Sequence, residues 1–223
     1  MGHIPDGQGH EHDGHLRLTY NDIHVTIGKT AEKIKANFDP DIMIAIGGGG
    51  FFPARVLRTF LKRSDGPSGS KRNIPIQAIG LSLYEEVGAF DGSSGLAQEE
   101  KIGREVVRTQ WLDFSTLGNR PLIGRRILIV DEVDDSRTTL AYAVAELKKD
   151  IDLQYSKLTA EQKAALPQTE LAIFVVHNKL KDKRATLPND VKYFAGEDIE
   201  DKWIDINILL HDEITQKQRA LGL

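Results

Sequence analysis

The chain has 223 residues, of which 28% are charged, a formal net charge of -4 and no cysteine. The absence of cysteine excludes disulfides, zinc–thiolate sites and thiol nucleophiles, and the acidic balance argues against a duplex-binding protein held by many phosphate contacts. No apolar run reaches the roughly 18 residues that cross a bilayer, and the N-terminus lacks the apolar stretch that is typical of a signal peptide. We therefore expect a soluble, cytoplasmic protein with no membrane or nucleic-acid partner.

The N-terminal part of the chain predicts a leader followed by a helix. Residues 1–16 are rich in glycine and histidine and have no apolar period, which predicts a disordered segment whose histidines bind metal only adventitiously. A short helix is expected from about residue 29. Ala31 and Ile34 lie on its apolar side, and Pro40 ends it.

A strand, a glycine turn and a helix come next. Residues 42–46 are continuously apolar, which predicts a strand buried on both faces. Four glycines at 47–50 break this strand, and residues 51–63 have the apolar spacing of an amphipathic helix. These three pieces form one βα unit.

The rest of the chain repeats this alternation. A polar insertion is expected over 150–170, with a short helix in it, and a helix follows the strand that ends at residue 130. Repeated βα units indicate an α/β protein with a parallel sheet flanked by helices, whose ligands bind outside the carboxyl ends of the strands. The further strands are expected over residues 74–84, 106–114, 126–130, 171–176 and, as the last one, 191–194.

Four carboxylates stand within five residues directly after the apolar run 126–130. The following turn into a helix exposes backbone N–H groups, and several hydroxyls beside it suit a phosphate. Asp131 and Glu132 could bind ribose hydroxyls and a hard cation such as Mg²⁺. Simple helix capping is the alternative, but it explains only one acid. Carboxylates this close repel one another unless a cation or a hydroxyl-rich ligand lies between them, which favours a sugar-phosphate site.

The stretch ILIVDEVDDSRTTL resembles the signature of the type I phosphoribosyltransferases, in which an apolar strand leads to two acids, two further residues and Asp-Thr-Gly-x-Thr. Ser136 replaces the usual threonine and Arg137 the usual glycine. The resemblance implies that Asp131 and Glu132 bind ribose and magnesium, and that Asp135 both contacts the donor and is the general base. It also implies a 5′-phosphate loop, made by Ser136, Arg137, Thr138 and Thr139.

Two segments nearer the N-terminus support the same resemblance. IAIGGGGFFPAR resembles the pyrophosphate loop of the family, with Gly47, Gly48 and Gly49 allowing close approach of the ligand; by itself it would also suit a plain strand-to-helix turn. LSLYEEVGAFDGSSG resembles the lid that closes over the donor, marked by Ser82 and Tyr84. An ordinary loop is the alternative there.

Two segments nearer the C-terminus resemble the base-binding half of the 6-oxopurine enzymes. EDIEDKWIDI resembles their hood, which implies that Trp203 stacks on the base, that the backbone of Ile204 contacts its edge and that Asp205 is a further metal ligand. A lone tryptophan is more often a core residue, but acids and a lysine flank this one. HNKLK resembles the place where a lysine binds the purine 6-oxygen, which implies Lys179, with His177 as the alternative.

The resemblance spans about residues 29–205 and is greatest to fungal hypoxanthine-guanine and xanthine phosphoribosyltransferases. It implies a type I fold with a core over 17–194 and a small hood over the site, formed by 195–223 with the N-terminal segment. The implied homodimer transfers phosphoribose from 5-phosphoribosyl 1-pyrophosphate to N9 of hypoxanthine, guanine or xanthine, with Mg²⁺ as cofactor. The products are pyrophosphate and a nucleoside monophosphate.

Two other functions stay open from the sequence. One is a non-catalytic regulator that kept the sugar-phosphate pocket, which the intact acids and the acidic charge disfavour. The other is a different ribose-phosphate enzyme of the same fold, such as a diphosphate synthase, which Trp203 disfavours.

Overall fold

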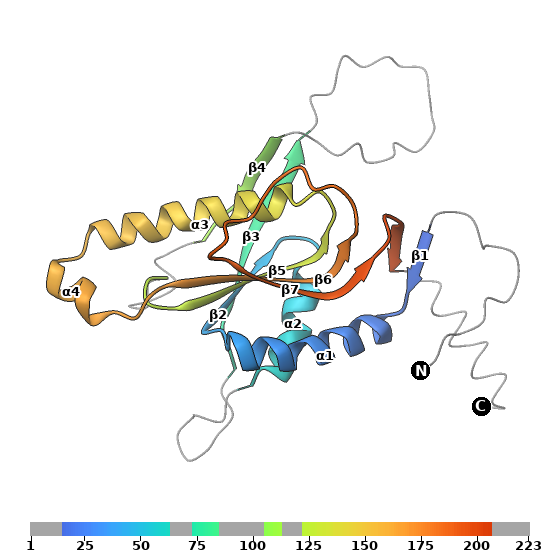
Figure 1. Ribbon diagram of the computed structural model, residues 1–223, viewed down its shortest axis with the longest axis horizontal. Helices are drawn as coiled ribbons and strands as arrows, with labels where there is room; N and C mark the ends of the chain where they lie inside the picture. Colours follow the sequence, from blue (N-terminus) through green and yellow to red (C-terminus); the bar gives the residue numbers. More distant parts are fainter. Residues whose placement is uncertain (1–14, 63–72, 85–104, 113–121, 207–223) are drawn as a thin grey trace, which may run out of the picture.

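The computed structural model describes residues 15–62, 73–84, 105–112 and 122–206 (Figure 1). Within these ranges one sheet has the strand order β4-β3-β2-β5-β6-β7, and a second, two-stranded sheet pairs β1 with β8. All neighbours pair in parallel except β3 and β4. The elements are β1 (His15–Leu18), α1 (Tyr20–Asn37), β2 (Ile42–Ile46), α2 (Phe51–Phe60), β3 (Ile76–Tyr84), β4 (Glu105–Gln110), β5 (Arg126–Asp134), α3 (Thr138–Ser156), α4 (Ala160–Ala165), β6 (Glu170–Lys179), β7 (Lys192–Ile199) and β8 (Trp203–Ile206).

Helices cover both faces of the larger sheet, with α3 on one face and α1 and α2 on the other (Figure 1). The strands therefore bury alternate side chains in two separate cores. Ile44 and Ile129 pack with Leu147 of α3 in one core, whereas Met43 and Leu128 belong to the core that holds α1 and α2. Every residue of β2 is buried, which confirms the expectation of a strand covered on both sides.

The first helix is longer than the sequence pattern indicated. It begins at Tyr20, not near residue 29, because Thr19 and Asp22 form a capping box in which each side chain accepts a hydrogen bond from the other's backbone N–H. Ile23 and Ile27 extend its buried side toward the N-terminus. The spacing Thr-x-x-Asp was the local signal for this start.

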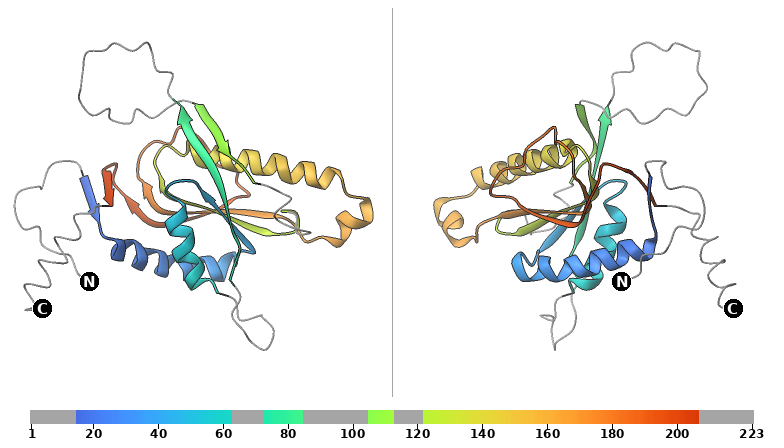
Figure 2. Two further views of the ribbon diagram at one scale, coloured as in Figure 1. Left: turned by 180° about the vertical axis from the view of Figure 1, so that it is seen from behind. Right: turned by 45° about the vertical axis from the view of Figure 1, so that its right-hand side comes forward.

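The small β1–β8 sheet was not expected from the sequence. His15 and Leu16, assigned to the disordered leader, belong to β1, and the strand expected as the last one continues as β7 to Ile199 before β8 follows. Four-residue strands give little local pattern, and these two are held by their pairing with each other. The views in Figure 2 show this sheet at the end of the molecule opposite α4.

The segment 150–170 begins inside a helix, since α3 runs to Ser156. The short helix expected there is present as α4, which starts with a capping box between Thr159 and Gln162. No helix in the described ranges is both long and apolar enough to span a membrane. Most of the expected lid, residues 85–98, lies outside the described residues.

Candidate active site

The acidic segment lies at the carboxyl edge of the sheet, between β2 and β6. It belongs to β5 itself, since β5 continues to Asp134, with Asp131 in register with Val175 and Asp134 with Asn178. We expected this strand to end at Val130. The extra length places the expected sugar acids at the edge where parallel α/β sheets bind ligands.

Asp131 and Glu132 are carboxylates in a poorly solvated position. Burial, together with the neighbouring charges of Glu132 and Asp134, raises the pKa of Asp131 to about 8. Burial also raises the pKa of Glu132 above its ordinary value. Burial disfavours the charged form of a carboxyl group, whereas a cation or hydroxyl donors beside it would favour that form and lower its pKa.

Two of the four helices in the described residues begin without a side-chain cap. The α1 and α4 N-termini have complete capping boxes, but Gly50 and Arg137, which precede α2 and α3, supply none. At α3 the Thr138 amide donates a long hydrogen bond, of 3.4 Å, to the hydroxyl of Ser136. Both uncapped N-termini lie at the carboxyl edge of the sheet, and exposed helix N–H groups there attract anions.

The glycine turn after β2 contacts the acidic segment directly. Gly48 has a φ of +79°, which side chains rarely adopt. At Gly49 a Cβ atom would lie 0.9 Å from Oε2 of Glu132, so the Glu132 carboxylate occupies the space of the missing side chain. The structure thus brings the expected pyrophosphate loop and one expected ribose acid into contact.

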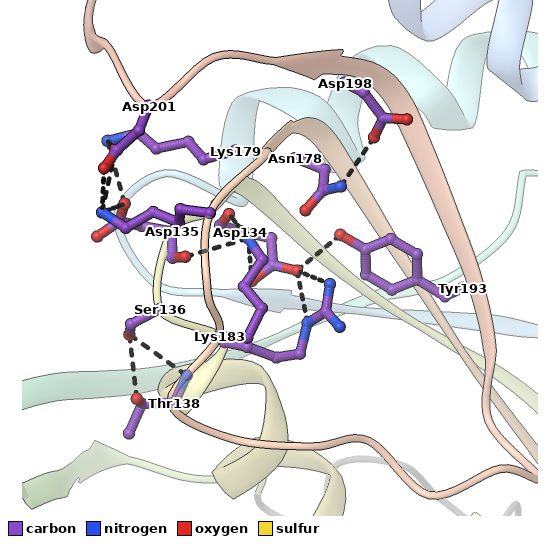
Figure 3. Close-up of polar contacts among 12 residues, drawn as sticks. Asp134, Asp135, Ser136, Thr138, Asn178, Lys179, Lys183, Tyr193, Asp198 and Asp201 are labelled. Carbon is purple, nitrogen blue, oxygen red and sulfur yellow. Dashed lines mark hydrogen bonds and ion pairs between the residues drawn. The ribbon is translucent and has the colours of Figure 1, made fainter.

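Arg137 replaces the family's usual glycine and has the backbone conformation that glycine favours, with φ 67° and ψ 0°. Its Nε donates a hydrogen bond of 2.8 Å to Oδ2 of Asp134, and its guanidinium lies 5.0 Å from the centre of the Tyr193 ring. The Tyr193 hydroxyl donates to the same Oδ2 at 2.7 Å (Figure 3). Asp134 is only 1% exposed, so this acid holds the loop and its neighbours in place.

The connection after β6 also fixes the loop. Lys183 Nζ donates to the main-chain oxygens of Asp134 and Asp135, at 2.6 and 3.1 Å. The Arg184 amide donates to the Ser136 carbonyl at 3.0 Å. In the sequence this connection is only a run rich in lysine and arginine, KLKDKR, because the partners of these residues lie almost 50 positions earlier in the chain.

Asp135, the expected general base, is paired with two lysines. Its Oδ1 lies 3.1 Å from Lys179 Nζ and 3.0 Å from Lys181 Nζ. Burial alone would raise the pKa of Asp135, but the hydrogen bonds from Lys181 and Lys179 outweigh it and lower that pKa. Asp135 is therefore held ionised, as a proton acceptor must be.

The geometry favours Lys179 over His177 as the residue facing a base. Lys179 reaches Asp135, whereas His177 is 2% exposed and pairs in register with Glu197 of β7. Glu197 accepts a hydrogen bond from Thr26 of α1, so His177 lies on the side of the sheet covered by that helix. Burial lowers the pKa of His177, against the opposing effect of the Glu197 charge.

The buried His177 predicts a loss of stability in mild acid. The unfolded chain binds a proton at this histidine near pH 6.5, whereas the folded protein does so only at lower pH, so the contribution present above pH 6.5 is lost as the pH falls. We expect a loss of at most about 1.4 kcal/mol per pH unit. Urea unfolding at pH 7.5 and 5.5 measures it, and an equal loss in His177→Gln would contradict the assignment.

The hood residues lie on the small sheet. Trp203 is 51% exposed and pairs in register with His15, while Ile204 pairs with Leu16. Asp205 accepts a hydrogen bond of 2.8 Å from His15. Among the described residues no group of three or more acids and histidines could hold a metal ion. The structure therefore does not bring Asp205 to the acid pair, contrary to the expectation of a shared metal site.

The two residues that marked the lid lie at the end of β3. Ser82 is exposed, and Tyr84 is the last residue of that strand. Thr138 and Thr139 are the first two residues of α3, as expected for the phosphate loop. Sequence reasoning missed Lys181, Lys183 and Tyr193, whose partners become apparent only from the pairing of β5 with β6 and β7.

A mostly parallel sheet has helices on both faces, and acids and uncapped helix N-termini lie at its carboxyl edge. These features define the class of α/β proteins that bind nucleotides or sugar phosphates. No family model matches the chain. Individual relatives do. The chain is 55% identical to the hypoxanthine-guanine phosphoribosyltransferase of Schizosaccharomyces pombe and 50% identical to xanthine phosphoribosyltransferase 1 of Saccharomyces cerevisiae, each over 85% of this chain and 86% or 87% of the relative.

A solved structure agrees in fold. A protein of Neisseria gonorrhoeae with bound ppGpp superposes with a TM-score of 0.64 at 33% identity, over 93% of this chain and 99% of that one. The identities to the fungal enzymes over most of both chains show the family. The chain belongs to the purine phosphoribosyltransferases, which confirms the resemblance, the α/β fold class and the assignment as an enzyme.

Proposed function

We propose that the enzyme transfers the phosphoribosyl group of 5-phosphoribosyl 1-pyrophosphate to N9 of a 6-oxopurine, namely hypoxanthine, guanine or xanthine. The products are a nucleoside monophosphate and pyrophosphate. The observation that carries this proposal is the pairing of Asp135 with Lys179 directly before the uncapped N-terminus of α3. Asp135, a proton acceptor, and Lys179, which can donate a hydrogen bond to a carbonyl oxygen, thereby lie next to the proposed phosphate site.

The donor half of the proposed site is built on β5 and α3. The amides and hydroxyls at Ser136, Thr138 and Thr139 would hold the 5′-phosphate, since the N-terminus of the 19-residue helix α3 favours an anion. Asp131 and Glu132 would accept hydrogen bonds from the ribose hydroxyls. The turn at Gly47, Gly48 and Gly49 would present backbone N–H groups to the pyrophosphate.

Magnesium fits the acid pair. Carboxylate oxygens are the ligands that Mg²⁺ prefers, and a cation held by these two consecutive acids of β5 would lower the carboxyl pKa values that burial raises. Asp131 and Glu132 would hold the ion together with oxygens of the donor. When bound, the ion neutralises charge on the departing pyrophosphate.

The base half of the proposed site is built on β6 and β8. Lys179 would donate to the purine 6-oxygen, the exposed ring of Trp203 would stack on the base, and the backbone of Ile204 would contact its edge. The names of the fungal relatives support a 6-oxopurine. The ppGpp bound to the Neisseria gonorrhoeae protein, a guanine nucleotide, supports a site that accepts guanine together with phosphates.

Asp135 would carry the proton transfer. In the proposed step N9 forms a bond to C1 of the ribose while the bond from C1 to the pyrophosphate oxygen breaks. The proton that leaves the purine imidazole passes to the carboxylate of Asp135. Orientation of the base by Lys179 and Trp203 would align N9 with C1, which makes the step effectively intramolecular.

An absorbance assay tests the function. The enzyme is mixed with the donor and Mg²⁺, and each of hypoxanthine, guanine, xanthine and adenine is added in turn. We expect turnover with at least one 6-oxopurine and far less with adenine, because the adenine 6-amino group cannot accept a hydrogen bond from Lys179. Donor binding without turnover of any base would instead favour a non-catalytic regulator.

Replacing Trp203 by alanine is expected to weaken base binding selectively. Stacking on an aromatic ring contributes about 1–3 kcal/mol per base, so the KM for the base should rise by roughly fivefold or more. The KM for the donor should change little. Steady-state kinetics with each substrate varied in turn measures both values, and equal increases in both would argue against stacking.

The start of α2 is a candidate dimer contact. Phe51 and Phe52 are 49% and 40% exposed, and Phe52 packs edge-on against Tyr20, itself 53% exposed, with ring centres 5.2 Å apart. Clustered exposed aromatic rings are typical of protein interfaces. We propose a homodimer through this surface. Sedimentation equilibrium should give the mass of two chains, and Phe51→Glu should shift it toward one; a dimer unaffected by that change places the contact elsewhere.

A further inference from the structure

The geometry points to Lys181 as a positioning residue that holds the carboxylate of Asp135 toward the base and ties it to the hood through Asp201. This inference rests on the proposed function, since it concerns the proton acceptor of that reaction. Nothing in the sequence motifs or in the relatives' names assigns a role to Lys181.

Lys181 bridges two acids from different parts of the chain. Its ammonium donates to Oδ1 of Asp135 and to Oδ1 of Asp201, each at 3.0 Å, and lies 2.9 Å from Oδ2 of Asp201. The Lys181 side chain is 28% exposed and that of Asp135 is 27% exposed. A tight turn, in which the Lys181 amide donates to the Lys179 carbonyl at 3.0 Å, places the two lysines on the same acid.

The two lysines are not equivalent toward the hood. Lys179 is nearer to Asp135 than to Asp201, at 3.1 against 3.7 Å, whereas Lys181 contacts both at about 3 Å. Asp201 stands two residues before Trp203 in the sequence. Lys181 therefore links the proton acceptor at the end of β5 to the segment that carries the stacking residue (Figure 3 shows Asp135, Lys179 and Asp201).

When a base binds, Lys181 becomes the one lysine that still pairs with Asp135, because Lys179 turns to the base. A 6-oxopurine that accepts a hydrogen bond from Lys179 draws that ammonium away from the carboxylate, and it also excludes water from the pocket. A carboxylate left alone there would become protonated and could not accept the purine proton. An ammonium has three N–H donors, so Lys181 can keep both acids at once.

The charged groups around Asp135 come from two segments, the stretch 179–183 and the one that holds Asp201. Lys179, the last residue of β6, and Lys181, two residues later, both contact the Asp135 carboxylate. Lys183 donates to the main-chain oxygen of Asp135, and the carboxylate of Asp201 also pairs with Lys179 and Lys181. Hydrogen bonds from Lys181 and Lys179 lower the pKa of Asp135 despite its burial. Removal of Lys181 should raise that pKa.

The variant Lys181→Met tests the inference through the pH profile of the reaction. The acid limb of kcat/KM for the base should move upward by about one pH unit, which is a tenfold loss of rate on that limb. The KM for the base should rise several-fold because the hood is no longer tied, while the KM for the donor stays within about twofold. Lys181→Arg should restore the acid limb, since arginine keeps the charge.

Lys202→Met is the matched control. Lys202 lies on the same segment as Asp201, and its one ion pair within the described part of the chain is with Glu200, at 2.9 Å on the surface. Its profile should equal that of the wild type. Asp201→Asn separates the two ends of the bridge: it should raise the KM for the base without moving the acid limb. If Lys181→Met does not fold, Asp201→Asn and Lys181→Arg still test the role of Lys181.

The assays give different results if the role of Lys181 is wrong and if the proposed function is wrong. An active wild type whose acid limb stays in place in Lys181→Met overturns the role of Lys181 alone. A wild type that turns over none of the four bases overturns the proposed function, and the role of Lys181 with it. An unchanged KM for the base in Asp201→Asn overturns the link to the hood.

Discussion

Replacing Asp135 by asparagine is expected to lower kcat by about 100-fold or more, because positioned general acid–base groups typically contribute 10²–10⁴-fold to the rate. Asparagine keeps the size of the side chain but cannot accept the purine proton as a carboxylate does. The KM for the donor should change little, since the phosphate loop keeps its contacts to Lys183 and Arg184. Initial rates with saturating donor and base measure the effect.

Asp198→Asn serves as the control for this change. Asp198 is an exposed acid at the same edge of the sheet, and it accepts a hydrogen bond of 2.8 Å from Asn178. Its removal should leave kcat within about twofold of the wild type. A turnover close to wild type in Asp135→Asn, with the protein folded by circular dichroism, would refute the assignment of Asp135 as the base.

Replacing Asp134 by alanine is expected to destabilise the protein by about 3–5 kcal/mol, the typical result of removing one partner of a buried ion pair. Arg137 and Lys183 would lose their counter-charge, and the Tyr193 hydroxyl would lose its acceptor. Because native proteins are stable by only about 5–15 kcal/mol, this is a large share. Urea unfolding followed by circular dichroism gives the free energy.

The control for stability is Asp190→Ala. Asp190 also pairs with a lysine, Lys148, at 2.7 Å, but its side chain is 70% exposed. Exposed pairs contribute about 0–1 kcal/mol, so this change should have a small effect. Comparable losses of stability in the two variants would show that the Asp134 cluster gains nothing from its burial.

Local patterns were sufficient for the elements that lie at the centre of the sheet. The continuous apolar residues of β2 and β5 have no other stable place than a covered sheet, so their position followed from hydrophobicity alone. The acids of β5 and the glycines before α2 were found for a similar reason, because chemistry at strand ends depends on a few consecutive residues.

Contacts between distant segments could not be derived in this way. In the sequence Asp134 is one more acid in a cluster, whereas in the structure it is buried beneath Arg137 and Tyr193. Only the pairing of β5, β6 and β7 brings these three residues together. The basic residues of 179–184 are visible in the sequence as a charge pattern. Which acid each of Lys179, Lys181 and Lys183 meets depends on the register of β6 with β5, which the sequence does not encode locally.

The parallel pairing of β1 with β8 has a consequence for the order of folding. The bond from His15 to Asp205 joins residues 190 positions apart, and closing so long a loop is entropically unfavourable until most of the chain is already fixed. Because synthesis proceeds from the N-terminus, β5 and α3 are complete well before β8 leaves the ribosome. We therefore expect a newly made chain to form the proposed sugar-phosphate site first and the proposed base site last.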